Sequence, residues 1–333
     1  MVRTPYRISF AGGGTDFAAW FTEQPGSVVS ATINRYSYLT LRQLPPFFPF
    51  KSRFVWSCVE KIDDLEAIQH PSIKSCLKFM GIDKPAIQIH HDGDLPAQSG
   101  MGTSASFTVG LLHGLHVLRG LAVSPRELAK HAMHVDQDLT GEVAGCQDHV
   151  AAAHGGLNHV KFGPERHDYS LTRLPLHNGK LVELQEHLLL LYTKTRDGKA
   201  SEIEAAKWQN RPLPAHDVIL RDQQALVAPT MDALEAGDHE ELARLLREGW
   251  ALKRAMSFAV DNDHALDCFR RAAAAGAKGG KLLGAGGGGC LLLVAPPESK
   301  QAVCEALPDC VPVPFEFEHQ GSQLIYYEPQ VLA

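Results

Sequence analysis

The sequence lacks the features that would assign it at once to several large classes of protein. Its seven cysteines include no Cys-x-x-Cys pair, and an odd number fits a reducing compartment better than a secreted disulfide scaffold. Basic residues are not in excess, because 32 Lys and Arg against 38 Asp and Glu give a formal charge of −6. No apolar run reaches the ~18 residues that a membrane span needs. We therefore expect no nucleic-acid partner and no membrane partner.

Common catalytic and targeting patterns are also missing. The segment 276–281 is one residue too short for a Walker A motif and is followed by Leu282 instead of Ser or Thr. The 17 histidines form no His-Glu-x-x-His pattern and no cysteines have zinc-finger spacing, so histidines without a metal role are favoured over a zinc hydrolase. The first residues carry Arg3, Arg7 and Asp16 and no apolar stretch, so we expect no signal peptide and a cytoplasmic location.

What remains is the composition of an ordinary globular protein of about two domains. The 333 residues, 44% of them apolar, exceed the ~150 typical of one domain. Strand and helix patterns mix without regular βαβ repetition, which indicates an α+β fold in two halves. The polar, turn-rich segment 163–180 is the expected boundary, and it divides the chain into 1–170 and 171–333.

Hydrophobic periodicity predicts the main elements of each half. In the first half we expect strands at 7–10, 28–41, 85–91 and 157–162, and helices at 103–119, 124–140 and 147–153. In the second half we expect strands at 188–192, 290–295, 311–318 and 323–328, and helices at 216–235, 238–256 and 261–275. Pro312 and Pro314 favour a sheet edge for the strand that contains them.

Glycine is the residue that stands out, since eight of the 29 lie in just two runs, 12–14 and 284–289. A shorter Gly/Ser loop at 99–102 precedes the predicted helix. The N–H groups and positive dipole of a helix beginning at Thr103 would point at that loop, an arrangement suited to phosphate. Hydroxyls of Thr103, Ser104 and Ser106 would add ligands for phosphate or a metal ion. An ordinary Ser/Thr helix cap after a glycine turn explains the same residues equally well.

The two glycine runs have two interpretations each. The run 284–289 matches G-x-G-x-x-G, but a helical stretch is expected before it and a strand after it, which is wrong for a dinucleotide fingerprint. It is either a wide structural turn or, because so many glycines cost backbone entropy, a close approach to a ligand or another loop. Asp16, after the run 12–14, either accepts hydrogen bonds from sugar hydroxyls or caps a helix at Phe17.

In their order and spacing these segments resemble the motifs of the GHMP kinases, the small-molecule kinases that include galactokinase, homoserine kinase, mevalonate kinase and phosphomevalonate kinase. The similar segments are 5–16 (PYRISFAGGGTD), 95–105 (LPAQSGMGTSA, the phosphate loop), 145–149 (GCQDH, before Gly155-Gly156) and 281–290 (KLLGAGGGGC). Together with Tyr192, Thr193 and Arg196, they look most like the motifs of the D-glycero-D-manno-heptose 7-phosphate kinases within that superfamily.

The resemblance implies a two-domain GHMP-kinase fold. Its N-terminal, ATP-binding half is like ribosomal protein S5 domain 2, its C-terminal half is ferredoxin-like α+β, and the active site lies in the cleft between them. The implied reaction is phosphorylation, with ATP and Mg²⁺, of the anomeric hydroxyl of a sugar phosphate. Heptose 7-phosphate would give the 1,7-bisphosphate, for nucleotide-activated heptose and capsule or lipopolysaccharide synthesis. A kinase of another, fucose-like sugar and a catalytically silent sugar-binding relative are the alternatives, and a homodimer is a possible assembly.

The resemblance also implies a role for each motif residue. Asp148 is expected to be the catalytic base and Arg7 its basic partner. ATP is expected at Ser99, Gly100, Met101, Gly102, Thr103 and Ser104, and Mg²⁺ at Ser104 and Asp136, with Asp138 as the alternative carboxylate. The sugar is expected at Gly13, Gly14, Thr15, Asp16, Arg196, Gly286 and Gly287, and its phosphate at cations chosen from Arg196, Lys199, Lys253 and Lys281. His149 and Lys194 depart from the common family residues, and both changes are expected in the sugar pocket.

Overall fold

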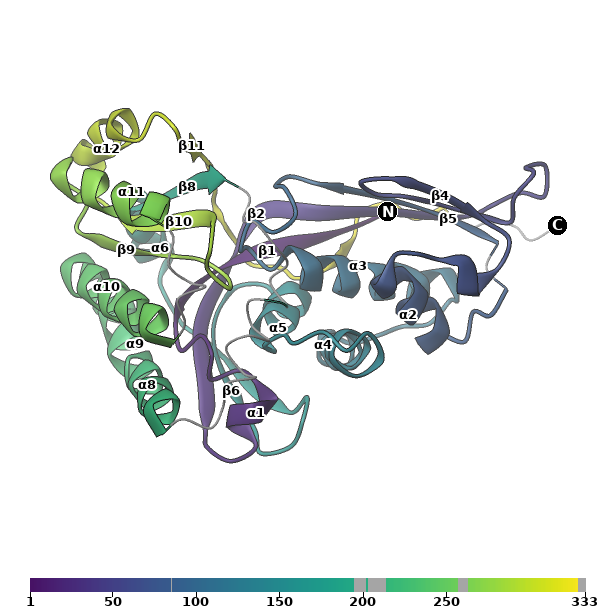
Figure 1. Ribbon diagram of the computed structural model, residues 1–333, viewed down its shortest axis with the longest axis horizontal. Helices are drawn as coiled ribbons and strands as arrows, with labels where there is room; N and C mark the ends of the chain where they lie inside the picture. The colour runs from purple at the N-terminus through teal and green to yellow at the C-terminus, as the bar shows by residue number, and fades with distance from the viewer. Residues whose placement is uncertain (85, 195–201, 203–213, 257–262, 329–333) are drawn as a thin grey trace.

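The fold is seen in a computed structural model that describes residues 1–84, 86–194, 202, 214–256 and 263–328 (Figure 1). Two antiparallel-rich sheets with helices packed on them form the two halves, so the predicted α+β class is confirmed. Among the described residues, no helix combines the length and apolar character that a membrane crossing requires.

The first half is built on a nine-stranded sheet. Its strands are β1 (Val2–Ala11), β2 (Gly26–Gln43), β3 (Ser52–Val55), β4 (Val59–Ile62), β5 (Ile87–Gly93), β6 (Leu157–Phe162), β7 (Tyr169–Arg173), β12 (Phe317–Glu318) and β13 (Gln323–Leu324). The long strand β2 organises the sheet, because it pairs with β1 along its length, with β6 at one end and with β5 at the other.

Helices cover one face of this sheet (Figure 1). They are α2 (Pro71–Phe79), α3 (Thr103–Leu118), α4 (Pro125–His134) and α5 (Gln147–His154), while the short α1 (Ala18–Phe21) follows the first glycine turn. Residues spaced four apart on α3, such as Phe107, Leu111 and Leu115, are buried in the same core as Leu39 and Ile89 of the sheet, as the periodicity predicts. This packing fixes the start of α3 relative to β1.

The helix predicted for 124–140 begins as expected but does not stay α-helical. Ser124 and Glu127 form a reciprocal capping box with Pro125 in the first turn. After α4 the chain continues as a π-helical turn, Val135–Leu139. Such turns displace the side chains that they carry from their α-helical positions, and here they carry Asp136 and Asp138.

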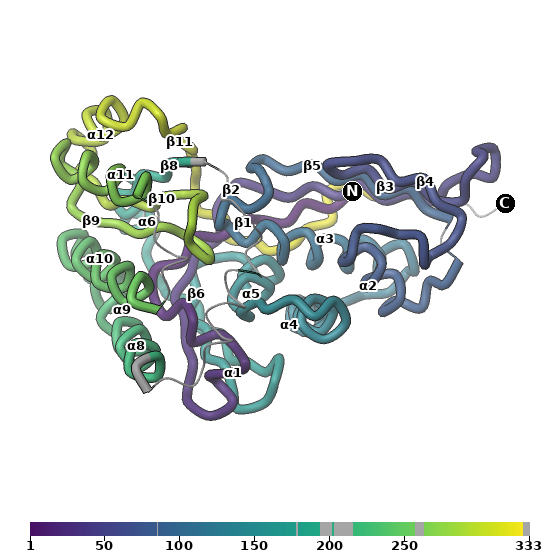
Figure 2. Tube along the Cα trace, in the orientation of Figure 1, coloured from purple at the N-terminus to yellow at the C-terminus, as the bar shows by residue number. Residues whose placement is uncertain are grey.

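The second half is a four-stranded antiparallel sheet between two layers of helices. Its order is β11 (Val311–Pro312), β8 (Leu188–Lys194), β10 (Gly289–Val294), β9 (Gly279–Leu282), which confirms the edge position of Pro312. Figure 2 shows α8 (Pro214–Ala225), α9 (Val227–Ala236) and α10 (His239–Met256) on one side, and α11 (Asp263–Ala274) and α12 (Lys300–Ala306) on the other. Successive residues of β10, such as Leu292 and Leu293, enter different cores on the two sides.

The two halves share a buried cluster, and segments from the second half of the chain join the sheet of the first. Tyr6, Ile8 and Phe10 of β1 lie in the same buried cluster as residues of α9, α10 and β10. The strands β12 and β13 return to pair with β2 and β1, and β7 pairs with β6 across the expected boundary at 170 and 171. The strands β12 and β13, near the end of the described chain, therefore belong to the first sheet. The expected division into 1–170 and 171–333 assigned them to the second domain.

Several predicted elements differ from the observed ones. The helix expected at 216–235 is two helices, α8 and α9, and the strands expected at 311–318 and 323–328 are two-residue pieces. The strand β9, not a helix, immediately precedes the glycine run 284–289, so the run is the loop of a hairpin between β9 and β10. The pattern did not reveal β3, β4, β7, α2, α6 (Asn178–His187) or α12, which are short or mostly polar. Residues 261 and 262 of the predicted last helix lie outside the described residues.

Candidate active site

The centre of the site is a bidentate ion pair between the start of the chain and the start of α5. Arg7 Nε donates to Asp148 Oδ1 at 2.7 Å, and Arg7 Nη2 donates to Asp148 Oδ2 at 2.8 Å. The third guanidinium nitrogen, Nη1, donates to the carbonyl of Gly100 at 2.7 Å. The Arg7 side chain is 5% exposed and that of Asp148 is 25% exposed. A carboxylate held on one side by a planar fork and open on the other can accept a proton from a ligand hydroxyl.

The phosphate loop reaches this pair through its backbone. Gly102 is the N-cap of α3 in the left-handed region, with φ of 74°, and no side chain caps the helix. The interpretation of Thr103 and Ser104 as an ordinary helix cap is therefore wrong. A Cβ on Gly102 would lie 3.2 Å from the Asp148 carboxylate, so the exposed N-terminal end of α3 lies beside the pair. Helix N–H groups without side-chain partners next to an Arg–Asp pair suit an anionic phosphate chain.

The glycine run of the second half closes against this loop. A Cβ on Gly100 would lie 2.5 Å from the carbonyl oxygen of Leu283, and the Cys290 N–H donates to the Ser99 carbonyl at 2.9 Å. Two backbones approach so closely only because side chains are absent there. Of the two interpretations of the run, the close approach to another loop is confirmed. Gly286 and Gly287 lie in the same turn, so the two halves meet at the phosphate loop.

The first glycine turn is joined to the segment of Asp148 through Asp16. The Asp16 carboxylate is fully buried and accepts the N–H groups of Gly14 at 3.0 Å and Gln147 at 3.1 Å. Burial, reinforced by nearby Asp148, raises the pKa of Asp16 to about 6 although these hydrogen bonds oppose the shift. Asp16 does not cap α1, whose N-cap is Phe17 without a side-chain hydrogen bond. The capping interpretation is therefore wrong.

Thr15 also lies in this turn, but its hydroxyl is used inside the fold. It donates to the carbonyls of Gly12 at 2.8 Å and Ser27 at 3.0 Å and accepts the Ser27 N–H at 3.1 Å. The side chain is fully buried. Thr15 therefore shapes the turn around Gly13 and Gly14, and the expectation that its side chain binds the sugar directly needs correction.

The structure does not bring Asp136 to the phosphate loop. Its two carboxylate oxygens accept hydrogen bonds from Thr108 Oγ1 and lie against His149 Nε2, both at 2.9 Å, and its side chain is 2% exposed. Burial alone would lower the pKa of His149, but the bonded Asp136 carboxylate raises it. Asp136 is thus committed to a buried contact between α3 and α5, which does not fit a magnesium ligand. The alternative, Asp138, pairs with Arg166 at 2.9 Å and His134 at 2.8 Å.

The departure of His149 from the common family residue suggested a change in the sugar pocket. The structure contradicts this expectation. The His149 side chain is buried in the first half, pointing to Asp136 and not to the glycine turns. For Lys194, the structure describes the backbone at the end of β8, where it pairs with Gly289. Ser104, in contrast, is exposed at the first turn of α3, where an incoming ligand can reach its hydroxyl.

Besides His149 Nδ1, three buried polar atoms that lie on the site segments have no partner within the described part of the chain. They are Ser9 Oγ on β1, Ser99 Oγ in the phosphate loop and Gln147 Oε1 beside Asp148. Buried polar atoms are nearly always hydrogen-bonded, so a polar ligand is a natural partner for these. Sequence reasoning did not single out Ser9 or Gln147 as candidate site residues, although they lie inside the motifs at 5–16 and 145–149, respectively.

Two lysines contribute positive charge near the glycine segments. Lys281 Nζ is buried and donates to the Phe10 carbonyl at 3.2 Å. Burial, with a smaller contribution from Arg7, lowers the pKa of Lys281 to about 7. Lys253 of α10 donates to the carbonyl of Gly284. Arg196 and Lys199, the other cations expected to hold the substrate phosphate, lie outside the described residues.

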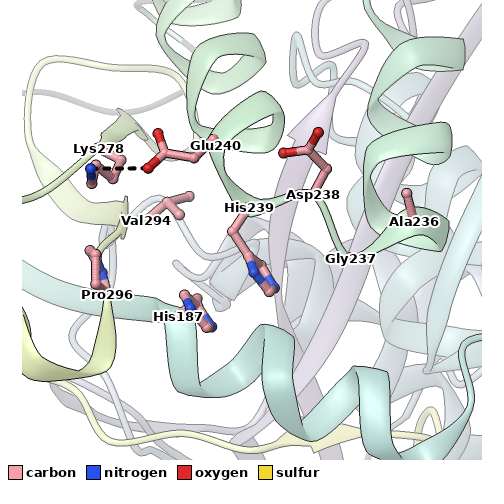
Figure 3. Close-up of a pocket in the computed structure, with 9 residues that line it drawn as sticks. All are labelled: His187, Ala236, Gly237, Asp238, His239, Glu240, Lys278, Val294 and Pro296. Atoms are coloured by element: carbon pink, nitrogen blue, oxygen red, sulfur yellow. Dashed lines mark ion pairs between the residues drawn. The ribbon is translucent and has the colours of Figure 1, made fainter.

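A pocket elsewhere on the second half is separate from this site. It is lined by His187, His239, Glu240, Lys278 and Val294, among others, and the two imidazole rings stack with their centroids 3.8 Å apart (Figure 3). Lys278 pairs with Glu240 across it at 3.0 Å. Val294 ends β10, whereas Gly289 at its other end touches the phosphate loop, so the strand's length of ~17 Å separates the two.

Comparisons with known proteins agree with this geometry. The family of GHMP kinase N terminal domains matches residues 66–156, and that of GHMP kinase C terminal domains matches residues 230–313. A D-glycero-alpha-D-manno-heptose 7-phosphate kinase of Campylobacter jejuni is 28% identical over 78% of this chain and 79% of its own length. A galactokinase of Pyrococcus furiosus is 24% identical over 74% of each chain.

Solved structures show the same fold. The crystal structure of a D-glycero-D-manno-heptose 1-phosphate kinase from Bacteroides thetaiotaomicron has a TM-score of 0.77 and 25% identity, over 98% of this chain and 100% of that one. A phosphomevalonate kinase of Streptococcus pneumoniae shares the fold at a TM-score of 0.73 and 16% identity, over 96% and 100% of the two chains. The two matching domain families together span more than half of the residues. The chain belongs to the GHMP kinases, a family of phosphotransferases.

Proposed function

We propose that this protein is a sugar kinase that transfers the γ-phosphoryl group of ATP to the anomeric hydroxyl of a sugar phosphate, with D-glycero-D-manno-heptose 7-phosphate as the substrate and the 1,7-bisphosphate as the product. The observation that carries the proposal is the Arg7–Asp148 pair, with bonds of 2.7 and 2.8 Å, beside the N-terminal end of α3. The similarity to heptose phosphate kinases supports the choice of sugar. The product would serve the synthesis of nucleotide-activated heptose.

Asp148 receives the proton of the attacking hydroxyl. Arg7 binds both carboxylate oxygens from one side and leaves their remaining lone pairs for the sugar. Because Arg7 also donates to Gly100, the same cation links the base to the phosphate loop. Negative charge that develops on the transferring phosphoryl group is stabilised by this guanidinium and by the N–H groups that begin α3.

ATP is assigned to residues 99–104. The backbone of Ser99, Gly100 and Met101 and the first turn of α3 at Thr103 surround the expected phosphate position, and the unpartnered Ser99 Oγ offers a further hydrogen bond. Magnesium, when bound, neutralises charge on the ATP phosphates. The exposed hydroxyl of Ser104 fits one ligand of this ion, and the buried carboxylate of Asp136 does not. Mg²⁺ commonly takes most of its ligands from phosphates and water, so one protein hydroxyl is compatible with its chemistry.

The sugar is assigned to the space bordered by the two glycine turns. Gly13 and Gly14 on one side, and Gly286 and Gly287 on the other, present backbone without side chains. Asp16 keeps the first turn in place through its bonds to Gly14 and Gln147. The unpartnered Gln147 Oε1 adds a hydrogen-bond acceptor for a hydroxyl. Lys281 and Lys253 are the described cations proposed to face the substrate's own phosphate.

Product analysis with four rival acceptors tests the proposal. The protein is incubated with ATP, Mg²⁺ and either heptose 7-phosphate, fucose, mannose or galactose, and phosphorus NMR identifies the phosphorylated position. We expect anomeric phosphorylation of heptose 7-phosphate with a kcat/KM at least about 100-fold above that of the unphosphorylated sugars, because those acceptors leave the cations proposed for the substrate phosphate without an anion. Equal efficiency with fucose would overturn the sugar-phosphate assignment. Binding of a sugar without any product would identify a silent relative.

A further inference from the structure

A cluster of metal-ligating side chains lies in the second half, away from the Arg7–Asp148 pair. His264 and Cys268 are one turn apart on α11, and Asp309 and Cys310 follow α12, about 40 residues later in the chain. One ligand atom from each of the four residues lies within 4.8 Å of every other. Both cysteines are buried, with exposures of 0% and 6%. The proposed kinase mechanism uses none of these residues.

Two of the distances in the cluster are close to those of a tetrahedral zinc site. The two sulfur atoms are 3.7 Å apart, and Cys268 Sγ is 3.7 Å from His264 Nε2. With Zn–S bonds of about 2.3 Å and a Zn–N bond of about 2.0 Å, tetrahedral geometry requires separations of about 3.8 Å between sulfurs and about 3.5 Å between sulfur and nitrogen. Thiol pairs in ordinary contact have a similar spacing, so the imidazole nitrogen at the same distance is the more informative feature.

The groups around these three atoms also suit a metal. His264 Nδ1, the nitrogen on the other side of the ring, lies 3.5 Å from Asp309 Oδ2, and ligating histidines usually have a carboxylate or carbonyl in that position. Asp309 is held in turn by Arg271, whose Nη1 and Nη2 donate to its two oxygens at 2.9 and 3.0 Å. Arg271 offsets the charge of this carboxylate, and a divalent cation would offset the charge of two thiolates.

We propose that His264, Cys268 and Cys310 bind a zinc ion, with His264 Nε2 and the two sulfurs as ligands and with Asp309 as the positioning residue that orients the imidazole. The ion would join α11 to the segment after α12 and so stabilise the outer helical layer of the second half. This site is independent of the proposed kinase reaction.

Zinc binding requires that both thiols lose their protons. On binding, two sulfur–zinc bonds form, the ion gives up bound water, and two protons pass to solvent without any change in oxidation state. Zinc affinity should therefore rise with pH.

The metal content of the full chain tests the site. The protein is produced with zinc in the medium, purified in a reducing buffer, dialysed extensively and analysed by plasma mass spectrometry. We expect about one zinc per chain, and less than about a tenth of that in Cys268→Ser and Cys310→Ser. Asp309→Asn should weaken binding by about 10- to 100-fold without abolishing it. Cys58→Ser is the matched control, because Cys58 is exposed and outside the cluster, and it should keep its zinc.

Two further measurements keep the test decisive. Cobalt added to the metal-free protein should produce thiolate-to-metal charge-transfer absorption in the wild type and in Cys58→Ser only. If the cysteine variants fail to fold, His264→Asn, at a partly exposed position, should fold and lose the cobalt spectrum. Failure of the reduced wild type to take up zinc or cobalt would overturn the proposal. So would isolation of the protein with Cys268 and Cys310 joined as a disulfide in most chains.

Discussion

Arg7 and Asp148 form two parallel hydrogen bonds although 141 residues separate them in the chain. The first belongs to a strand of the central sheet and the second to the first turn of α5. Their contact depends on the packing of α3 and α5 against β1 and β2. The same guanidinium donates to the phosphate loop, so three segments distant in sequence meet at one side chain.

Replacement of Asp148 by Asn should remove the proposed base and keep the shape of the side chain. We expect phosphoryl transfer to fall by about 10²- to 10⁴-fold, because general-base catalysis contributes on that scale, while ATP binding stays close to that of the wild type. A coupled assay and calorimetric titration with ATP measure the two quantities. Asp168→Asn is the control, since Asp168 makes a comparable pair with Arg126 at a partly exposed position. Near-normal turnover of Asp148→Asn would exclude the assigned role.

Replacement of Arg7 by Lys should retain the charge and lose the two-pronged geometry. The ammonium group of lysine does not have the planar fork that lets Arg7 donate to both Asp148 oxygens and to Gly100 at once. We therefore expect the free energy of unfolding to fall by about 2 kcal/mol and kcat to fall by at least about 10-fold. Denaturant unfolding and steady-state kinetics measure these effects. In Arg126→Lys, whose pair with Asp168 is partly exposed, both changes should be small. Equal behaviour of the two variants would contradict the special position of Arg7.

Two glycine-to-alanine changes separate backbone strain from interference with the proposed base, Asp148. Gly102 and Gly120 have φ values of 74° and 66°, so alanine should cost about 1 to 2 kcal/mol of stability at either. A methyl group at 102 would lie 3.2 Å from the Asp148 carboxylate, whereas no atom lies within 4 Å of one at 120. We expect only Gly102→Ala to lower kcat, by about 100-fold, as misplaced catalytic groups do. If the two variants have the same kcat, the close approach of residue 102 to Asp148 has no effect on turnover.

Ser104 and Ser106 are two hydroxyls on α3 with different expected roles. Ser104 is exposed, and Ser104→Ala should raise the Mg²⁺ concentration needed for half-maximal turnover. Ser106 is buried and donates to the Pro5 carbonyl at 2.9 Å, so Ser106→Ala should cost about 1 kcal/mol of stability and leave the Mg²⁺ requirement unchanged. Magnesium titrations of kcat and thermal melts measure both. An unchanged Mg²⁺ dependence in Ser104→Ala would remove this residue from the metal site.

Asp16 should leave a signature in the pH dependence of stability. Its folded-state pKa of about 6 lies above the ordinary 3.8, so the folded protein binds this proton more tightly than the unfolded chain, and protonation favours folding. As the pH falls from 7 to 4.5, the free energy of unfolding of the wild type should therefore rise by about 2 kcal/mol relative to that of Asp16→Asn, whose side chain at position 16 does not titrate. Denaturant unfolding of both proteins across this range measures the difference. A constant difference would show that Asp16 titrates at its ordinary pKa.

The sequence located the principal elements of the site but not every residue role. Order and spacing of the glycine motifs indicated the loop at 99–102 and the helix at 103, and both are observed. The role expected of Asp136 failed because a π-helical turn and His149, one residue after Asp148, direct its carboxylate inward. The role expected of Thr15 failed because its hydroxyl bonds to Ser27, on the neighbouring strand. Neither partner is visible in a local pattern.

The sequence by itself determined the α+β class and the positions of the glycine turns, because these depend on local periodicity and on backbone positions that favour glycine. The kinase family followed from the resemblance of four motifs, in order and spacing, to those of known family members. The tertiary structure alone decided that Gly284 lies on Gly100, that the last strands complete the first sheet, and that His264, Cys268 and Cys310 form one cluster. Such contacts join residues between about 40 and 320 positions apart. Packing of whole helices and strands sets them, and that packing reflects the summed burial of many side chains and not any short motif.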